Sequence, residues 1–151
     1  MINKILIVGT GALATFYSIK LSKKFDVTLL GTWSDGIEAI NKGVILEDHD
    51  SLITGRVKAL KDWSSVVEAD ITIWLTKAYK NIDLLTRYKA LGLMNPIFIL
   101  QNGIGQLTIF KDILGDEVAI FEGVTSQAAK LKRPGYVVNN GDGDLLMSSN
   151  P

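Results

Sequence analysis

The sequence predicts a doubly wound α/β domain with a mostly parallel sheet, and three observations support that prediction. Residues Ile5 to Val8 form a short apolar run that glycines follow directly, which is typical of a strand buried on both faces. Apolar runs then alternate with apolar residues at helical spacing along most of the chain, as in βαβ units. No repeat, low-complexity segment or Pro/Ser-rich linker interrupts residues 1–151, so we expect one domain.

The first elements form a strand, a helix and a second strand. Apolar residues at helical spacing run from Leu13 to Leu21, and residues 26–30 form the next apolar run. Two strands joined through a helix pair in parallel by a right-handed crossover. A short helix that ends near Lys42 comes next, and we expect Asp35 as its N-cap, with Glu38 three residues later completing a capping box.

The strict alternation breaks after Gly43. Three short β-prone segments follow, and we expect a small antiparallel excursion formed by residues 44–46, 52–54 and 56–59. The alternation resumes with strands at 71–75, 97–100 and 118–122 and helices at 81–91 and 104–114. Residues 134–147 predict a hairpin that turns at Asp142-Gly143, and the basic residues 130–133 are expected in a solvated loop.

Composition restricts the class of protein. A chain of 151 residues with 47% hydrophobic and 21% charged residues is of ordinary globular type and buries about 70% of the surface of its unfolded chain. Sixteen basic residues balance sixteen acidic ones, so nothing indicates a nucleic-acid partner. The absence of cysteine excludes disulfides, thiolate metal sites and thiol catalysis. No apolar run approaches the ~20 residues of a membrane span, and we expect a cytoplasmic protein without membrane contact.

The turn after the first strand carries a phosphate-binding pattern. Gly9-Thr10-Gly11-Ala12-Leu13-Ala14 has the form G-x-G-x-x-A between a strand and a helix, as in Rossmann-like domains. Gly9 permits the tight turn, Gly11 lets a pyrophosphate approach the backbone, and Ala14 keeps the helix close to the strand. The anion would then meet the free N–H groups of the helix N-terminus. A glycine turn that only packs tightly, or one that holds S-adenosylmethionine or FAD, is the alternative at this point.

Polar or glycine residues follow four further predicted strands, namely Gly31-Thr32-Trp33, Thr76-Lys77, Gln101-Asn102-Gly103 and Glu122-Gly123-Val124-Thr125. Because ligands of a parallel sheet bind beyond the carboxyl ends of its strands, this convergence predicts a cofactor cleft. The second strand lacks both the acid typical of NAD sites and the Arg typical of NADP sites. Hydroxyls of Thr32 and Ser34 can donate to a phosphate, and Trp33 can stack on adenine or serve packing. We therefore favour NADP and leave NAD open.

His49 is the only histidine, and it lies among carboxylates in the segment Glu47-Asp48-His49-Asp50. One histidine beside acids can bind a metal ion, but a polar turn between two short strands is the simpler interpretation. We expect an exposed turn residue and no metal site.

Together these motifs resemble a known family. The glycine turn, Leu75-Thr76-Lys77-Ala78-Tyr79, Leu100-Gln101-Asn102-Gly103-Ile104-Gly105, Gly123-Val124-Thr125 and Pro134-Gly135 are similar to the N-terminal cofactor domain of 2-dehydropantoate 2-reductase, also called ketopantoate reductase. The resemblance spans nearly all of residues 1–151. Family members continue into a C-terminal helical domain, involved in catalysis and dimerisation, that has no counterpart here.

The resemblance implies NADPH-dependent reduction of ketopantoate to pantoate, a step toward pantothenate and coenzyme A. It implies that the glycine turn, Thr32, Trp33 and Thr125 bind the cofactor, and that Lys77 and Asn102 bind it on the nicotinamide and substrate side. Hydride transfer needs an acid that protonates the alkoxide. In the family that acid resembles a lysine of the second domain, so we expect no catalytic residue within this chain. The late glycine-rich segment has Asn139-Asn140 where the family often carries a histidine.

Alternatives stay open at two levels. Lys77 can meet a phosphate, a ribose hydroxyl or a carboxylate, or be an ordinary loop lysine, and Asn102 can bind a ribose or a keto acid or cap the next helix. The protein as a whole can be a free-standing NAD(P)-binding module, a reductase of another 2-keto acid or a structural domain. Without a second domain, we expect apolar surface at the strand-end cleft to be exposed and to favour self-association, including homo-oligomers.

Overall fold

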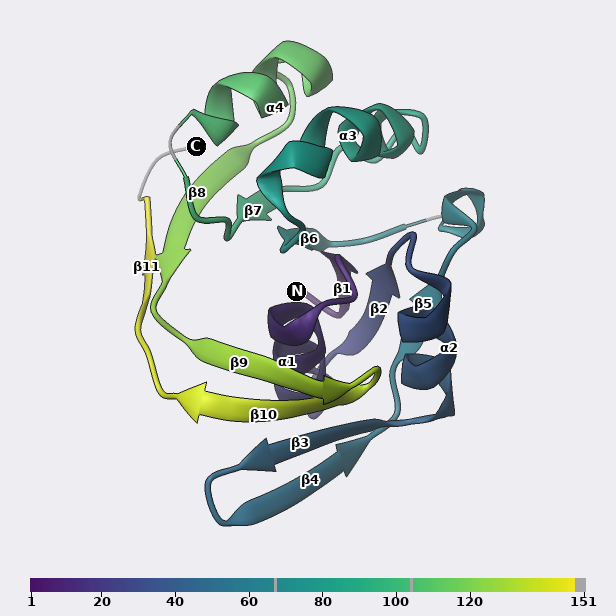
Figure 1. Ribbon diagram of the computed structural model, residues 1–151. Coiled ribbons are helices and arrows are strands. Elements are labelled where there is room, and N and C mark those ends of the chain that lie inside the picture. The colour runs from purple at the N-terminus through teal and green to yellow at the C-terminus, as the bar shows by residue number, and fades with distance from the viewer. Residues whose placement is uncertain (67, 104, 149–151) are drawn as a thin grey trace.

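The computed structural model describes residues 1–66, 68–103 and 105–148, which form two sheets packed with α-helices (Figure 1). The larger sheet has the strand order β11-β8-β7-β6-β1-β2-β5. Its strands are β1 (Lys4–Val8), β2 (Asp26–Leu30), β5 (Lys58–Leu60), β6 (Ile71–Trp74), β7 (Ile97–Ile99), β8 (Ile120–Thr125) and β11 (Leu145–Met147). Neighbouring strands are parallel except β11, which runs antiparallel to β8. The predicted doubly wound sheet is confirmed.

The direction of strand addition reverses beside β1. From β1 the chain adds β2 on one side, and from β6 it adds β7 and β8 on the other. Crevices at such a switch point, outside the carboxyl ends of the strands, are where open α/β sheets bind ligands. The fold therefore places the glycine turn that follows β1 at the expected position for a ligand.

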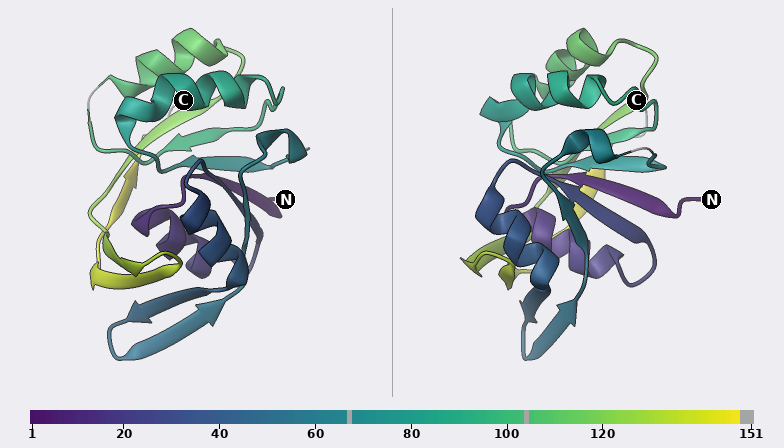
Figure 2. Two further views of the ribbon diagram at one scale, coloured as in Figure 1. Left: turned by 45° about the vertical axis from the view of Figure 1, so that its right-hand side comes forward. Right: turned by 90° about the vertical axis from the view of Figure 1, so that its right-hand side faces the viewer.

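Helices cover both faces of the larger sheet, as the two turned views in Figure 2 show. They are α1 (Ala12–Leu21), α2 (Ser34–Lys42), α3 (Asn81–Lys89) and α4 (Gln106–Leu114), with short 3₁₀ turns η1 (Trp63–Ser65) and η2 (Ala78–Lys80). Side chains of β1 alternate between the two layers: Ile5 and Ile7 pack with α1 and α2, whereas Leu6 and Val8 pack with α3 and α4. Apolar side chains therefore cover both faces of β1, as is typical of a parallel strand in the middle of a sheet.

The layer under α3 and α4 is centred on an indole ring. Trp74 is fully buried and makes edge-on contacts with Tyr88, at 5.6 Å between ring centroids, and with Phe110, at 5.0 Å. Such T-shaped pairs add about 0.5–1.5 kcal/mol beyond the area they bury. They fix the end of β6, which carries part of the candidate site.

The smaller sheet has the order β4-β3-β10-β9, with β3 (Val44–Asp48), β4 (Ser51–Gly55), β9 (Ala128–Arg133) and β10 (Tyr136–Gly141). The predicted antiparallel excursion is confirmed for β3 and β4. The third predicted segment instead joins the larger sheet as β5, parallel to β2. Asn41 of α2 explains this, because its amide exchanges hydrogen bonds of 2.8 and 2.9 Å with the backbone of Ala59 and satisfies the edge of β5.

The predicted hairpin at Asp142-Gly143 is wrong. β10 pairs with β9 in antiparallel fashion and with β3 in parallel, whereas β11 pairs with β8. The hairpin turn lies at Pro134-Gly135, where Gly135 has φ +74° and a Cβ would come 3.2 Å from the backbone of Ala39. The Asp-Gly pair carries the chain from the smaller sheet to the larger one. An Asp-Gly turn suits either connection, so local sequence did not decide between them.

Other differences are local. Residues 130–133 lie in β9 and not in a loop, because they pair with β10 and Leu131 packs against the core that α1 covers. Trp33, not Asp35, is the N-cap of α2, which has no side-chain cap, and Glu38 forms an ion pair with Lys42 instead of closing a capping box. The predicted start of the fourth helix at Ile104 lies outside the described residues. No helix in the described parts of the chain is long and apolar enough to cross a membrane.

Candidate nucleotide-binding site

The turn between β1 and α1 is as tight as its sequence requires. The Gly9 amide donates to the Leu30 carbonyl at 2.8 Å, which extends the pairing of β1 with β2. Gly9 has φ +136°, and a Cβ there would lie 3.2 Å from the Leu75 carbonyl oxygen and 3.5 Å from Cβ of Ala14. Both the positive φ and the lack of space for a Cβ therefore require glycine at position 9. Ala14 has a small side chain where α1 passes close to this turn.

Gly11 has a different reason to be glycine. It is the N-cap of α1, with φ −84° and no side-chain cap, and a Cβ built on it meets no heavy atom within 4 Å. The space above its backbone is open, and the first N–H groups of α1 are left without capping side chains. A phosphate or pyrophosphate can approach such an open backbone closely and accept hydrogen bonds from the free N–H groups at the positive end of the helix dipole.

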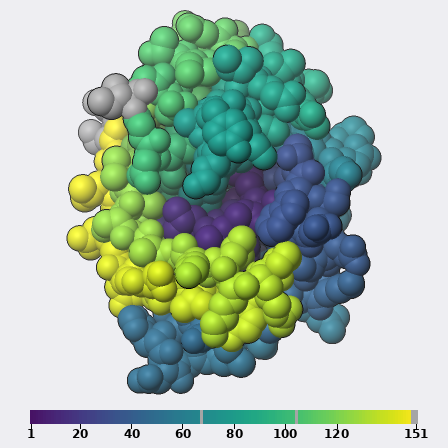
Figure 3. All heavy atoms as spheres, viewed as in Figure 1, coloured from purple at the N-terminus to yellow at the C-terminus, as the bar shows by residue number. Residues whose placement is uncertain are grey.

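A cavity of about 240 Å³ lies on this turn at the carboxyl ends of β1, β2 and β6. Figure 3 shows the purple N-terminal segment on the floor of a hollow between the teal, blue and yellow-green parts of the surface. Six of the predicted site residues line this cavity: Gly9, Thr10, Gly11, Thr32, Trp33 and Lys77. An open cavity of this size holds part of a dinucleotide, with the remainder along the surface.

Sequence reasoning missed two residues of this cavity, Lys80 and Leu84. Lys80 ends the 3₁₀ turn η2 and Leu84 lies one turn into α3. The spacing of Lys80 from Lys77 could have indicated it, since residues three apart in a 3₁₀ turn lie on the same side; no such signal in the sequence pointed to Leu84. Two lysines and no carboxylate line the cavity in the described chain, so it favours an anion.

The end of β2 is shaped by Thr10. A Cβ at Gly31 would lie 2.6 Å from Cγ2 and 2.8 Å from Oγ1 of Thr10, so a side chain there requires Thr10 to move. Trp33 packs its ring against Gly36, where a Cβ would come within 2.3 Å of the indole. The indole is still 39% exposed, which leaves one part of it available for stacking.

A buried amide network joins the end of β6 to the end of β7. Asn81 Nδ2 donates to Gln101 Oε1 at 2.7 Å, and Gln101 Nε2 donates back to Asn81 Oδ1 at 2.9 Å. Asn81 Oδ1 also accepts from the Trp74 indole N–H at 3.0 Å, and Gln101 donates to the backbone carbonyl of Thr76. Two loops that bear candidate ligand residues are thereby held together.

The predicted site residues Asn102 and Thr125 lie outside the cavity. Lys77 and Asn102 are exposed neighbours of this network, but Asn102 does not line the cavity and does not cap α4. Thr125 lies elsewhere, with its hydroxyl 2.9 Å from the Tyr17 hydroxyl of α1. Glu122 accepts from the Leu107 amide at 3.1 Å and so serves the start of α4.

A second hollow of about 380 Å³ lies at the ends of β7, β8 and β11, beside the first along the sheet edge. Gln101, Gly103, Glu122 and Gly123 contribute to it. Its rim is apolar, because Val124, Leu146 and Met147 are 61%, 71% and 46% exposed. Exposed apolar surface at the strand ends was expected from the sequence and is present.

A third hollow, of about 760 Å³, lies between α2, the start of β3 and the β9–β10 turn. It contains none of the predicted site residues and is remote from the carboxyl ends of β1 and β6. Its walls combine Arg56 and Arg133 with Asp35 and Glu38, so opposite charges share an open groove. We do not assign it to the nucleotide.

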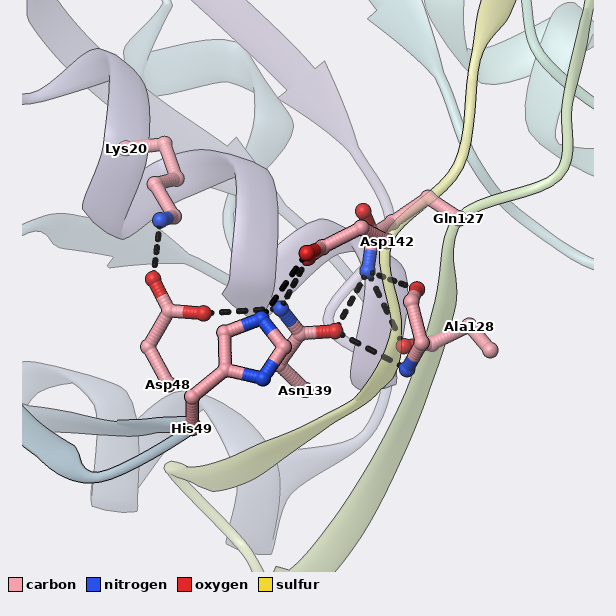
Figure 4. Close-up of polar contacts among 8 residues, drawn as sticks. Lys20, Asp48, His49, Gln127, Ala128, Asn139 and Asp142 are labelled. Atoms are coloured by element: carbon pink, nitrogen blue, oxygen red, sulfur yellow. Dashed lines mark hydrogen bonds and ion pairs between the residues drawn. The ribbon is translucent and has the colours of Figure 1, made fainter.

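His49 belongs to a polar cluster at the end of the smaller sheet where the parallel strands β3 and β10 both end (Figure 4). It has φ +53° in the β3–β4 turn, and its Nε2 lies 2.8 Å from Asp142. Ligand atoms of Asp48, His49 and Asp142 all lie within 4.8 Å of one another. The Asn139 amide donates to both carboxylates, at 2.7 and 2.8 Å, and Lys20 forms an ion pair with Asp48. The predicted exposed turn residue thus has protein partners.

These contacts lower the pKa of Asp48. The hydrogen bond from Asn139 is the main cause and the contact with Lys20 adds to it. The pKa of Asp142 is lowered in the same way, by hydrogen bonds from Asn139 and then His49. Both groups are therefore carboxylates that bind side chains of the fold, and the cluster ties β10 to the β3–β4 turn and α1.

The fold is that of a Rossmann-like α/β domain, with a glycine turn at the switch point and two lysines beside it. Comparison with known proteins is more specific. The family model described as "Ketopantoate reductase PanE/ApbA" matches residues 5–151. This chain belongs to the ketopantoate reductase family.

Individual relatives agree with that assignment. A 2-dehydropantoate 2-reductase of Streptococcus pyogenes is 31% identical over 96% of this chain and 48% of its own length. The crystal structure of 2-dehydropantoate 2-reductase from Geobacter metallireducens is similar with a TM-score of 0.80 at 27% identity, over 95% of this chain and 48% of that one. A complex of D-mandelate dehydrogenase with NADH has a TM-score of 0.80 at 25% identity, over 95% and 46%. The chain spans about half the length of the curated relatives it matches.

Proposed function

We propose that this chain is the NADPH-binding half of an oxidoreductase that reduces ketopantoate or a related 2-keto acid. The observation that carries the proposal is the cavity at the switch point, which combines the glycine turn, the β2 loop and two lysines. The family match supports ketopantoate as the substrate class. The similarity to a D-mandelate dehydrogenase supports the wider class of 2-keto and 2-hydroxy acids.

Each part of the cavity has a role in this proposal. The pyrophosphate lies on the backbone of Gly11 and the N-terminus of α1, where a Cβ would enter the same space. The adenosine ribose lies at Thr32 and Trp33. We assign Lys77, which lines the cavity, and Asn102, which does not, to the nicotinamide and substrate side, where an ammonium and an amide can bind a carboxylate or a ribose hydroxyl. When bound, NADPH supplies the hydride.

NADP is favoured over NAD by what the end of β2 can hold. A carboxylate that binds both ribose hydroxyls normally extends from this position, but Gly31 has no room for a side chain beside Thr10. The cavity also lacks any acid that would repel an additional phosphate. The family resemblance implies that the catalytic acid is a lysine of a second domain, so we assign that role there and not to Lys77 or Lys80 of this cavity.

Titration of the chain with NADPH, followed by nicotinamide fluorescence, tests the proposal. We expect saturable binding, and no loss of nicotinamide absorbance when ketopantoate is added to the chain and NADPH. The absence of NADPH binding would overturn the proposed function. Turnover of ketopantoate by the chain alone would instead show that the catalytic group is present in it.

A further inference from the structure

The two lysines of the cavity are free to bind a ligand. Lys77 and Lys80 are both exposed, and neither forms an ion pair with another residue in the parts of the chain that the structure describes. The ammonium of Lys80 lies 6.0 Å from the centroid of the Tyr79 ring. A contact of this kind at an exposed site is weak, so it does not prevent the side chain from turning to a phosphate.

NADP differs from NAD by one phosphate on the adenosine ribose. Domains that select NADP usually present an Arg after the second strand, but this chain has Gly31, Thr32 and Trp33 there. Position 31 excludes a side chain because of its contact with Thr10, and the next two residues are neutral. A cation that selects NADP must therefore come from another loop.

We propose that Lys80 is that cation and binds the 2′-phosphate of the adenosine ribose; this inference rests on the proposed function. The cavity runs from Thr32 and Trp33 across the glycine turn to Lys80. With the pyrophosphate on Gly11 and the ribose at the β2 loop, the 2′-phosphate is the remaining anionic group on the adenosine half. Lys80 follows β6, on the opposite side of β1 from β2, and lines the same cavity as Thr32 and Trp33.

Lys61 is the competing cation. It follows β5, and its ammonium donates to the Ser34 hydroxyl at 2.8 Å, close in sequence to the β2 loop. It does not line the cavity, however, and its hydrogen bond holds it at the start of α2. The two candidates make different predictions for single substitutions, so an experiment can separate them.

The experiment measures dissociation constants of the wild-type chain and of Lys80→Gln, Lys61→Gln and Lys89→Gln. The probes are NADPH and NADH, together with 2′-phospho-ADP-ribose and ADP-ribose, which lack the nicotinamide. We expect the wild type to prefer the 2′-phosphorylated member of each pair, and Lys80→Gln to weaken that member by about 10-fold, as expected for one charge-assisted contact. Lys80→Gln should leave NADH and ADP-ribose within about 2-fold of wild type.

A control variant and three alternative outcomes test the assignment of Lys80 further. Lys89 lies at the exposed end of α3, and Lys89→Gln controls for the general loss of one positive charge. Equal weakening of both members by Lys80→Gln, or a loss of preference in Lys61→Gln instead, would overturn the assignment of Lys80 while leaving the proposed function intact. Equal affinity of the wild type for NADPH and NADH would do the same. Failure of the wild type to bind any of the four would overturn the proposed function itself.

Discussion

Asn81 and Gln101 face each other as a pair of buried amides, each donating to the other, at 2.7 and 2.9 Å. Asn81 begins α3 and Gln101 follows β7, so the pair couples the start of that helix to the loop after that strand at the carboxyl edge of the sheet. Neither residue lines the cavity on the glycine turn. Their role in the account is to position the loops of Lys77 and Asn102.

Asn81→Ala removes this pair and leaves the Trp74 indole N–H and Gln101 Oε1 without their partner, while Gln101 Nε2 keeps its bonds to Thr76. Each buried donor left unpaired costs roughly 1–3 kcal/mol, so the free energy of unfolding should fall by that amount or more. We also expect NADPH affinity to fall, because the two loops lose their common support. Thermal unfolding and NADPH titration of the same preparation measure both effects.

Asn95→Ala is the matched control for this change. Asn95 also donates from a partly buried amide, to Thr72 Oγ1 at 2.9 Å, but it precedes β7 and lies at the opposite edge of the sheet. It should lower stability and leave NADPH affinity unchanged. If both variants lose affinity in proportion to stability, Asn81 has only a structural role.

Gly9 and Gly11 should respond oppositely to alanine. Gly11→Ala adds a methyl group in open space at an allowed φ, so the midpoint of unfolding should change little, since Gly and Ala differ by only ~1 kcal/mol at most at such sites. The same methyl group would block the pyrophosphate and weaken NADPH by about 10-fold or more. In Gly9→Ala the new methyl group would crowd the Leu75 carbonyl, and the positive φ would be strained. This variant should therefore lower the midpoint of unfolding, unlike Gly11→Ala. Unchanged NADPH affinity in Gly11→Ala would mean that the turn serves packing alone.

Gly31→Ala tests the steric account of the β2 loop. Its methyl group would lie 2.6 Å from Cγ2 of Thr10, and overpacking of this kind typically costs about 1–3 kcal/mol. The double variant Gly31→Ala/Thr10→Ala should recover most of the loss, because the clashing group is gone. Chemical denaturation of the three variants gives the coupling, and additive effects would refute the contact.

Asp48→Asn tests the polar cluster of Figure 4 through pH. The pKa of Asp48 is lowered in the folded chain, chiefly by Asn139, so its contribution is present above its unfolded pKa of about 3.9 and is lost as pH falls through the folded pKa. The difference in unfolding midpoint between wild type and variant should be largest near neutral pH and should shrink below pH ~4. A difference that is constant with pH would assign the effect to packing.

Local sequence patterns were sufficient for the larger sheet and for much of the site. A strand, a glycine turn and a helix with alternating apolar neighbours admit few topologies, and six predicted residues line one cavity. The β9–β10 half of the smaller sheet could not be predicted, because β10 pairs with β3 over a long separation and β9 pairs only with β10 in the described chain. The half-exposed alternation of β9 also resembles a polar loop. Lys80 was missed for a similar reason: its place in the cavity depends on where η2 brings the chain after β6.

The central claim is that the glycine turn at the switch point binds a pyridine dinucleotide, and thermal unfolding of the chain with NADPH, with NADH and without ligand tests it most directly. A ligand at about one hundred times its dissociation constant adds about 2.7 kcal/mol, and each kcal/mol raises the midpoint of a domain this size by ~2–4 °C. We expect a clear rise with NADPH, a smaller one with NADH, and a rise with NADPH in Gly11→Ala that is reduced to about half or less at the same nucleotide concentration. No rise with either nucleotide in the wild type would contradict it.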